Sequence, residues 1–203
     1  MTNIQIPHNY AFWGPLLWFG KISLDHCDEL LIRGRKLNVP LNDMLASIID
    51  DVKEFTTRYD RKFITDIMHP YLQSYIEFSM QWHNKKEKPM PELELTKVWL
   101  NIQKANEYNP EHTHGGDLSF VIYLDIPKEI QLENAEYIGT SSGPGAINFR
   151  YGEDHDWAVS AQSFLPEKGD IYIFPAKLAH SVIPFKSNVE RISVAGNFKF
   201  IYD

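Results

Sequence analysis

The amino-acid sequence predicts an α+β protein in which helices cover one sheet of a β-sandwich or barrel. In the first half of the 203 residues, apolar side chains recur at about helical spacing, whereas in the second half they alternate along the chain, as in strands. The period changes at a charged, proline-bounded stretch, residues 85–91. We therefore expect a single domain over residues 1–203, with a mainly helical bracing region in residues 1–92 and a strand-rich core in residues 93–203.

The composition limits both the class of protein and the kinds of residue that could bind a metal. A content of 43% hydrophobic and 13% aromatic residues suits a packed core, and a formal net charge of −7 argues against a broad basic surface for nucleic acid. Cys27 is the one cysteine, so a bound metal would be held by His, Asp or Glu. The apolar residues 12–19 are too few to span a bilayer and are expected to form an opening strand. With no signal-peptide pattern at the start, we expect a cytoplasmic protein without a membrane role.

The first half predicts three helices. Ser23 or Asp25 is placed to cap a short helix that Gly34 would end. A second helix is expected over residues 41–55, where apolar residues recur at helical spacing. A third is expected to begin at Pro70, because proline is favoured in the first turn of a helix.

Alternation in the second half predicts a series of strands. In residues 98–103 and 118–124, one face of each strand is apolar and the other is more polar. Gly143-Pro144-Gly145 and Gly169-Asp170 mark turns between strands. Further strands are expected over residues 146–151, 171–174, 181–184 and 191–200.

Three of the eight histidines are candidate metal ligands: His112, His114 and His180. His112 and His114 lie two residues apart in an extended segment, so both side chains can point to the same side. His180 comes from a distant strand and would complete a set of ligands that leaves coordination positions open, as a catalytic metal requires. A His-x-His pair in a Gly-rich loop also arises by chance, and His180 alone is typical of a hydrogen-bonded residue at a strand edge.

Arg191 is the second feature that points to a ligand. Alternation places Arg191, Ser193 and Asn197 on one face of a strand whose other face is apolar, so Arg191 should point into the barrel. A buried Arg is rare unless it is paired, and its planar guanidinium fits a carboxylate bidentately. We therefore expect an internal anion, which is either the carboxylate of a ligand, the alternative we favour, or a protein carboxylate in a salt bridge.

Three other polar residues lie near these positions in the predicted barrel. Asn101 and Tyr123 are on the more polar faces of their strands and are candidate pocket residues, although ordinary buried hydrogen bonding would explain each as well. Asp117 could be a metal ligand, because His and carboxylate together suit iron(II). A turn residue is the favoured interpretation of Asp117, since it follows Gly115-Gly116.

The order and spacing of these motifs resemble the 2-oxoglutarate/Fe(II)-dependent oxygenase superfamily, and within it a group of oxygenases found in marine bacteria and their phages. The resemblance covers about residues 94–200. The resembling stretches are residues 98–101, 111–114 leading into 118–124, 169–175 up to His180, and 191–193.

The resemblance implies a double-stranded β-helix, a jelly-roll or cupin-like barrel, with the N-terminal helices packed on one sheet. It also implies an enzyme that uses Fe(II), 2-oxoglutarate and O2. Arg191 and Ser193 match the superfamily's Arg-x-Ser and would hold the distal carboxylate of 2-oxoglutarate. We expect Asn101 and Tyr123 to line the same co-substrate pocket.

The same resemblance makes His112 the first iron ligand and His180 the distal one. At the second position the superfamily has Asp or Glu, whereas this sequence has His114. The third ligand could therefore be His114, Asp117 or a water molecule. A neutral ligand in place of an anion would change the charge at iron and so its potential.

The resemblance predicts a dioxygenase that hydroxylates a small molecule or a peptidyl residue, with release of succinate and CO2. A zinc-dependent hydrolase is an alternative, because residues 112–117 approximate the signature of metallo-β-lactamase-like hydrolases, with the spacing off by one residue. A non-enzymatic cupin-like metal-binding module is another, but it leaves Arg191 without a role. A third alternative is a non-enzymatic β-sandwich binding module, in which the histidines would have only a structural role.

Overall fold

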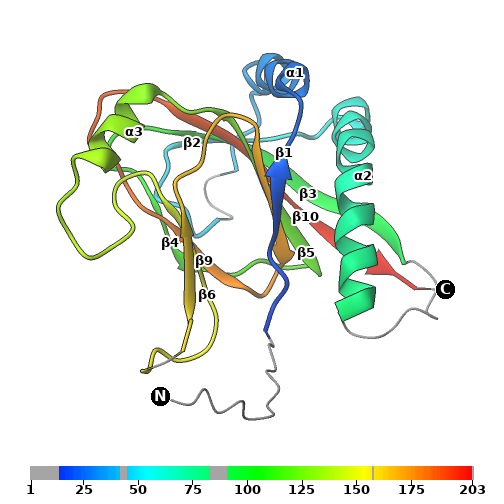
Figure 1. The fold of residues 1–203 in the computed structure, drawn as a ribbon. Helices are drawn as coiled ribbons and strands as arrows, with labels where there is room; N and C mark the ends of the chain where they lie inside the picture. Colours follow the sequence, from blue (N-terminus) through cyan, green and yellow to red (C-terminus); the bar gives the residue numbers. More distant parts are fainter. Residues whose placement is uncertain (1–13, 42–44, 83–90, 157, 203) are drawn as a thin grey trace, which may run out of the picture.

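Two antiparallel sheets form the body of the protein (Figure 1). The computed structural model describes residues 14–41, 45–82, 91–156 and 158–202. Within these ranges, the larger sheet has the order β1-β8-β5-β10-β3-β2 and the smaller one the order β4-β9-β6-β7. The strands of the larger sheet are β1 (Trp18–Lys21), β2 (Asp51–Glu54), β3 (Glu92–Gln103), β5 (Leu118–Asp125), β8 (Asp170–Pro175) and β10 (Arg191–Ile201). Those of the smaller sheet are β4 (Asn109–His112), β6 (Ile147–Arg150), β7 (Ala161–Phe164) and β9 (Ala179–Val182).

Helices α1 (Leu24–Gly34) and α2 (Arg58–Trp82) cover the outer face of the larger sheet, as Figure 1 shows. The third helix, α3 (Lys128–Ala135), lies between β5 and β6 in the chain. Of the helices in the described ranges, none has the length and apolar character needed to cross a membrane. The main hydrophobic core therefore lies between the larger sheet and helices α1 and α2.

Alternation along the long strands separates this core from the interior between the sheets, as the sequence predicted. On β3, Val98 and Leu100 pack in the core under the helices, whereas Asn101 lines a cavity on the opposite face. On β10, Val194 faces the core and Arg191 the cavity. A period of two thus places the candidate site residues on the inner face of the sheet.

The prediction of a helix over residues 41–55 is wrong. Residues 51–54 form β2, which pairs with β3, and residues 42–44 lie outside the described ranges. Ile48 is 52% exposed while Ile49 is 3% exposed, so the buried side chains do not follow the helical spacing. Ile49 and Val52 pack on Trp99 of β3, and this packing together with the strand pairing outweighs the local apolar spacing.

The helix expected to begin at Pro70 begins twelve residues earlier, at Arg58. The Thr57 hydroxyl accepts a hydrogen bond from the Asp60 N–H at 3.1 Å, which satisfies an open donor of the first turn. Pro70 lies inside α2, where a proline costs about 3 kcal/mol. Burial of Met68 and Leu72 on either side of it stabilises the continuous helix.

Other elements agree with the sequence in part. The cap of α1 is Ser23, whose side chain accepts from the His26 N–H at 3.2 Å. The opening strand, β1, starts at Trp18, and the part of the expected strand before residue 14 lies outside the described ranges, as do most of residues 85–91. β9 begins at Ala179 instead of residue 181. Strand β7 and helix α3 were not predicted from the sequence, and for β4 only an extended segment at residues 112–114 was expected.

The two neighbouring isoleucines test the corrected structure of residues 45–54. Ile49→Ala should lower the free energy of unfolding by about 2–5 kcal/mol, because it opens a hole in a packed cluster. Ile48→Ala should change it by less than about 0.5 kcal/mol, because that side chain is largely exposed. Urea unfolding measures both values, and the reverse order would support the helix.

Candidate metal centre and adjoining cavities

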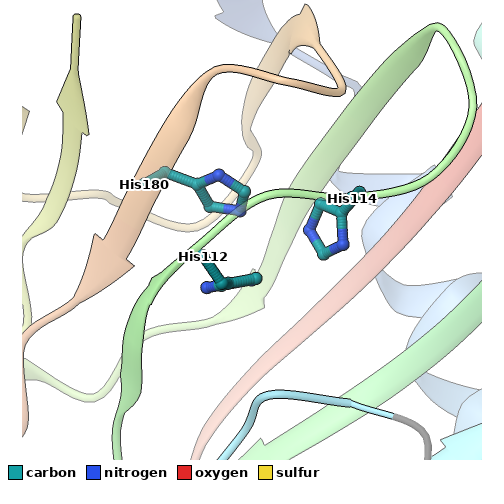
Figure 2. A group of neighbouring side chains, drawn as sticks. All are labelled: His112, His114 and His180. Atoms are coloured by element: carbon teal, nitrogen blue, oxygen red, sulfur yellow. The ribbon is translucent and has the colours of Figure 1, made fainter.

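The three candidate histidines converge on one point (Figure 2). His112 ends β4 and pairs with His180 of β9 across the smaller sheet. His114 follows in the loop before β5, and its backbone N–H donates to the Ala176 carbonyl at 2.8 Å. The ligand atoms of the three side chains all lie within 4.8 Å of one another. The predicted convergence of residues far apart in the sequence is therefore present in the structure.

Backbone carbonyls fix the orientation of two of the rings. Nδ1 of His112 lies 2.7 Å from the Pro110 carbonyl oxygen, and Nδ1 of His180 lies 2.9 Å from that of Leu178. A carbonyl oxygen can only accept, so each Nδ1 carries the proton and donates. Each Nε2 therefore keeps a free lone pair, and a hydrogen bond behind the ring is the usual way in which proteins orient a metal-binding histidine.

Burial keeps the rings of His114 and His180 neutral. It lowers the pKa of His114 to about 3, with His180 and His112 adding to the effect. Burial together with His112 lowers the pKa of His180 to about 4, against a smaller opposing effect of the Leu178 carbonyl. Both rings are thus unprotonated at neutral pH, which is the form that binds metal.

Asp117 is not part of this cluster. Its carboxylate accepts from the Phe200 N–H at 2.8 Å, and its own N–H donates to the Phe198 carbonyl at 2.8 Å. Asp117 thus fastens the loop after His114 to β10, in keeping with the favoured interpretation as a turn residue. In the described ranges, the group that could hold a metal consists of the three histidines, a set that fits a divalent ion such as Fe(II) and leaves room for other ligands.

Arg191 lies in the same cavity as the histidines, at the far end from His114 along the inner face of the larger sheet. We call this space, lined among others by Asn101, His112, His180, Arg191 and Ser193, the inner cavity. Arg191 is 3% exposed, and its guanidinium donates to the Gly145 carbonyl and to Oε1 of Gln103. Burial lowers the pKa of Arg191, and within the described ranges no carboxylate is paired with it.

Helix α3 positions the carbonyl that Arg191 contacts. Nδ2 of Asn134 donates to the Ser142 carbonyl at 3.1 Å and to the Pro144 carbonyl at 2.8 Å, which fixes the turn just before Gly145. Gly145 has a φ of +77°, and a Cβ there would lie 2.4 Å from Cγ2 of Ile130. The sequence marked this turn by its glycines but did not link it to Arg191.

The remaining predicted residues also line the inner cavity. Ser193 of β10 lies opposite Asn101 of β3, and Nδ2 of Asn101 donates to Oγ of Ser193 at 3.4 Å. Tyr123 lies under the guanidinium of Arg191, 5.6 Å from its carbon to the ring centre, and burial raises the pKa of Tyr123 to about 12. The predicted residues are thus together, although the sequence did not identify Gln103 as a partner of Arg191.

A second, more open space adjoins the inner cavity, and we call it the outer chamber. Trp99, Asn101, Asn109, His112 and His114 line both spaces, so the chamber leads to the histidines. The lining residues that belong to the outer chamber alone are Leu45, Ala46, Ser47, Thr96, Lys97, Thr113, Gly115, Gly116, Asn197 and Lys199.

Solved structures with the same fold include an oxidoreductase of the 2OG-Fe(II) oxygenase family, a prolyl hydroxylase and an epimerase. An oxidoreductase of the 2OG-Fe(II) oxygenase family from Burkholderia pseudomallei is 12% identical, with a TM-score of 0.54 and coverage of 87% of this chain and 77% of that chain. A prolyl-4-hydroxylase from Pseudomonas putida is 13% identical, with a TM-score of 0.53 and coverage of 92% of this chain and 93% of that chain. The epimerase SnoN from nogalamycin biosynthesis was solved in complex with Fe3+, alpha-ketoglutarate and nogalamycin RO. It is 15% identical, with a TM-score of 0.55 and coverage of 90% of this chain and 78% of that chain. At these identities the likeness shows the fold.

The sequence itself matches the family model described as "Putative 2OG-Fe(II) oxygenase" over residues 97–197, about half of the chain. No curated protein matches it. The matched segment runs from β3 into β10 and includes the three histidines and Arg191. The chain belongs to the 2OG-Fe(II) oxygenase superfamily, and its cofactors are Fe(II) and 2-oxoglutarate.

The support that α3 gives to the turn at residues 142–145 can be measured. Asn134→Ala removes the donor to two carbonyls and should lower the free energy of unfolding by about 1–2 kcal/mol. Lys128→Ala, an exposed change on the same helix, should alter it by less than about 0.5 kcal/mol. Urea unfolding gives both values, and equal effects would show that the two hydrogen bonds contribute nothing.

Proposed function

We propose that this enzyme is a 2-oxoglutarate- and Fe(II)-dependent dioxygenase that hydroxylates its substrate, with release of succinate and CO2. Iron would be held by His112, His114 and His180, and the distal carboxylate of 2-oxoglutarate by Arg191 and Ser193. The observation that carries this proposal is the position of a buried guanidinium without a carboxylate partner in the cavity that the three histidines line.

The strand order supports a double-stranded β-helix as the framework. From β3 to β10 the chain passes back and forth between the two sheets, with β6 and β7 as neighbours in the smaller one. The four central strands of the larger sheet have the order β8-β5-β10-β3 and the smaller sheet has the order β4-β9-β6-β7, and all of these strands except β7 line the inner cavity. In this arrangement the ends of β4 and β9 bring His112 and His180 together, and β10 carries Arg191 into the space between the sheets.

Bound Fe(II) and 2-oxoglutarate supply the oxidising chemistry, and the protein contributes position and electrostatics. The carbonyls of Pro110 and Leu178 hold two imidazoles with Nε2 available. The guanidinium of Arg191 is fixed before any ligand arrives, so little ordering is needed to bind a carboxylate. Apolar side chains on the cavity wall, Val121 and Phe174 among them, exclude water and would strengthen the attraction between the Arg191 guanidinium and a bound carboxylate.

Asn101 and Tyr123 would complete the co-substrate pocket. Asn101 holds the Ser193 hydroxyl, and Tyr123 presents its ring to the guanidinium of Arg191. Three further expectations stay predictions. They are the resemblance to oxygenases of marine bacteria and their phages, the cytoplasmic location, and the division of the chain into a bracing region, residues 1–92, and a core, residues 93–203.

A zinc hydrolase could use the same three histidines, because zinc accepts three nitrogen ligands and one open position. A zinc hydrolase does not account for the buried guanidinium of Arg191, and neither does a cupin-like metal-binding module. Dependence on 2-oxoglutarate separates these alternatives from the dioxygenase.

The proposed role of Arg191 is tested by anaerobic titration of the iron-loaded protein with 2-oxoglutarate, followed by the visible charge-transfer band. The wild-type protein should develop the band. Arg191→Ala should weaken 2-oxoglutarate binding by about tenfold to a hundredfold, the loss expected for a charge-assisted hydrogen-bonded pair. Iron affinity should be unchanged. Absence of the band in the wild-type protein, or an equal loss of iron and 2-oxoglutarate in the variant, would contradict the proposal.

The identity of the third ligand is tested by a pair of variants. His114→Ala should reduce Fe(II) affinity by more than about a hundredfold, since even residues behind the ligands contribute tenfold to a hundredfold. Asp117→Asn should leave Fe(II) affinity unchanged, because its carboxylate contacts the backbone of Phe200. Competition with a chromophoric chelator measures both. Full affinity in the His114 variant would exclude His114 as a ligand.

A further inference from the structure

The outer chamber differs in charge from the chain as a whole. The sequence carries a net charge of −7, yet Lys97 and Lys199 line the chamber, and none of its described lining residues is Asp or Glu. A cleft lined by one sign of charge attracts ligands of the opposite sign. The chamber that leads to the histidines is therefore suited to an anion.

Three oxygen atoms in the walls of this chamber are buried without a hydrogen-bond partner in the described part of the chain: Oγ of Ser47, Oδ1 of Asn101 and Oδ1 of Asn109. Asn101 is 6% exposed and its Nδ2 is engaged with Ser193, so it is the oxygen that lacks a partner. Unpaired buried acceptors are rare in folded proteins and are costly. A ligand that donates hydrogen bonds would satisfy them.

2-Oxoglutarate cannot be this ligand, because its two carboxylates and its keto group offer only acceptors at neutral pH. The protein itself satisfies a third asparagine of the chamber, since Oδ1 of Asn197 accepts from Oγ of Ser119 at 2.8 Å. The oxygens left over at Asn101 and Asn109 thus point to a second molecule, one that donates hydrogen bonds.

We propose that the substrate is a small anion that also carries N–H or O–H donors, of the class of free amino acids and 2-hydroxy acids. Its donors would bind the oxygens of Ser47, Asn101 and Asn109, and its carboxylate would lie toward Lys97 and Lys199. A residue within a polypeptide keeps a backbone N–H donor but has no free α-carboxylate, so its main chain would offer no anion to Lys199. The inference rests on the proposed function, because it places the substrate beside the histidines.

The experiment uses the full chain loaded with Ni(II) and saturating 2-oxoglutarate, so that binding is measured without turnover. Free L-amino acids and 2-hydroxy acids are titrated by calorimetry, and each one that binds is compared with its 2-keto acid, which lacks the donor, and its amide, which lacks the anion. At least one should bind, with both analogues weaker by about tenfold or more. Equal binding by either analogue, no binding by the whole set, or binding by a proline-containing peptide alone would overturn the proposal.

Variants then connect binding to the named atoms. Asn109→Ala should weaken the compound that binds by about fivefold to thirtyfold, the loss of one or two hydrogen bonds. Lys199→Gln should also weaken it, whereas Lys128→Gln, which removes a charge from α3, should not. Thermal melts establish that each variant is folded. If 2-oxoglutarate fails to bind, the proposed function is wrong; if it binds but Asn109 and Lys199 have no effect, only the substrate assignment is wrong.

Discussion

The buried guanidinium of Arg191 is the constraint around which the interior of this protein is organised. A cation removed from water must be compensated, and its described partners, Gln103 and Gly145, supply hydrogen bonds but no negative charge. Gln103 comes with β3, and Gly145 is held in place by Ile130 and Asn134 of α3. Parts of the fold that are distant in the chain thus support a buried positive charge that has no carboxylate partner in the described ranges.

The fold was predictable where the alternation of apolar residues is long and uninterrupted. Leu100 and Val194 identified the helix-covered face of β3 and β10, and with it the inward direction of Arg191. The prediction failed in residues 41–55, where packing on Trp99 decides the structure, and at Pro70, where burial of the neighbouring residues outweighs the cost of proline in a helix. Local patterns cannot reveal either, because both depend on contacts with remote strands.

The site was predictable to the extent that it depends on side-chain chemistry and strand direction. His112, His114 and His180 are rare residue types at positions that two-residue periodicity turns inward. What the sequence could not show are the backbone contacts that make the site rigid: the carbonyls of Pro110 and Leu178 and the turn held by α3. Such contacts carry no sequence signal, since every residue has a carbonyl group.

Charge balance links the unusual ligand set to the chamber beside it. In the proposed site, Fe(II) on three neutral imidazoles, doubly charged 2-oxoglutarate and the Arg191 guanidinium would sum to one positive charge, whereas a carboxylate in place of His114 would bring the sum to zero. A centre with net positive charge would attract an anionic substrate at short range, and a neutral centre would not. As an iron ligand, His114 would therefore favour an anionic substrate at the centre, and Lys97 and Lys199 add positive charge at the outer chamber. The histidine that departs from the superfamily's pattern and the lysines of the chamber thus favour the same kind of substrate.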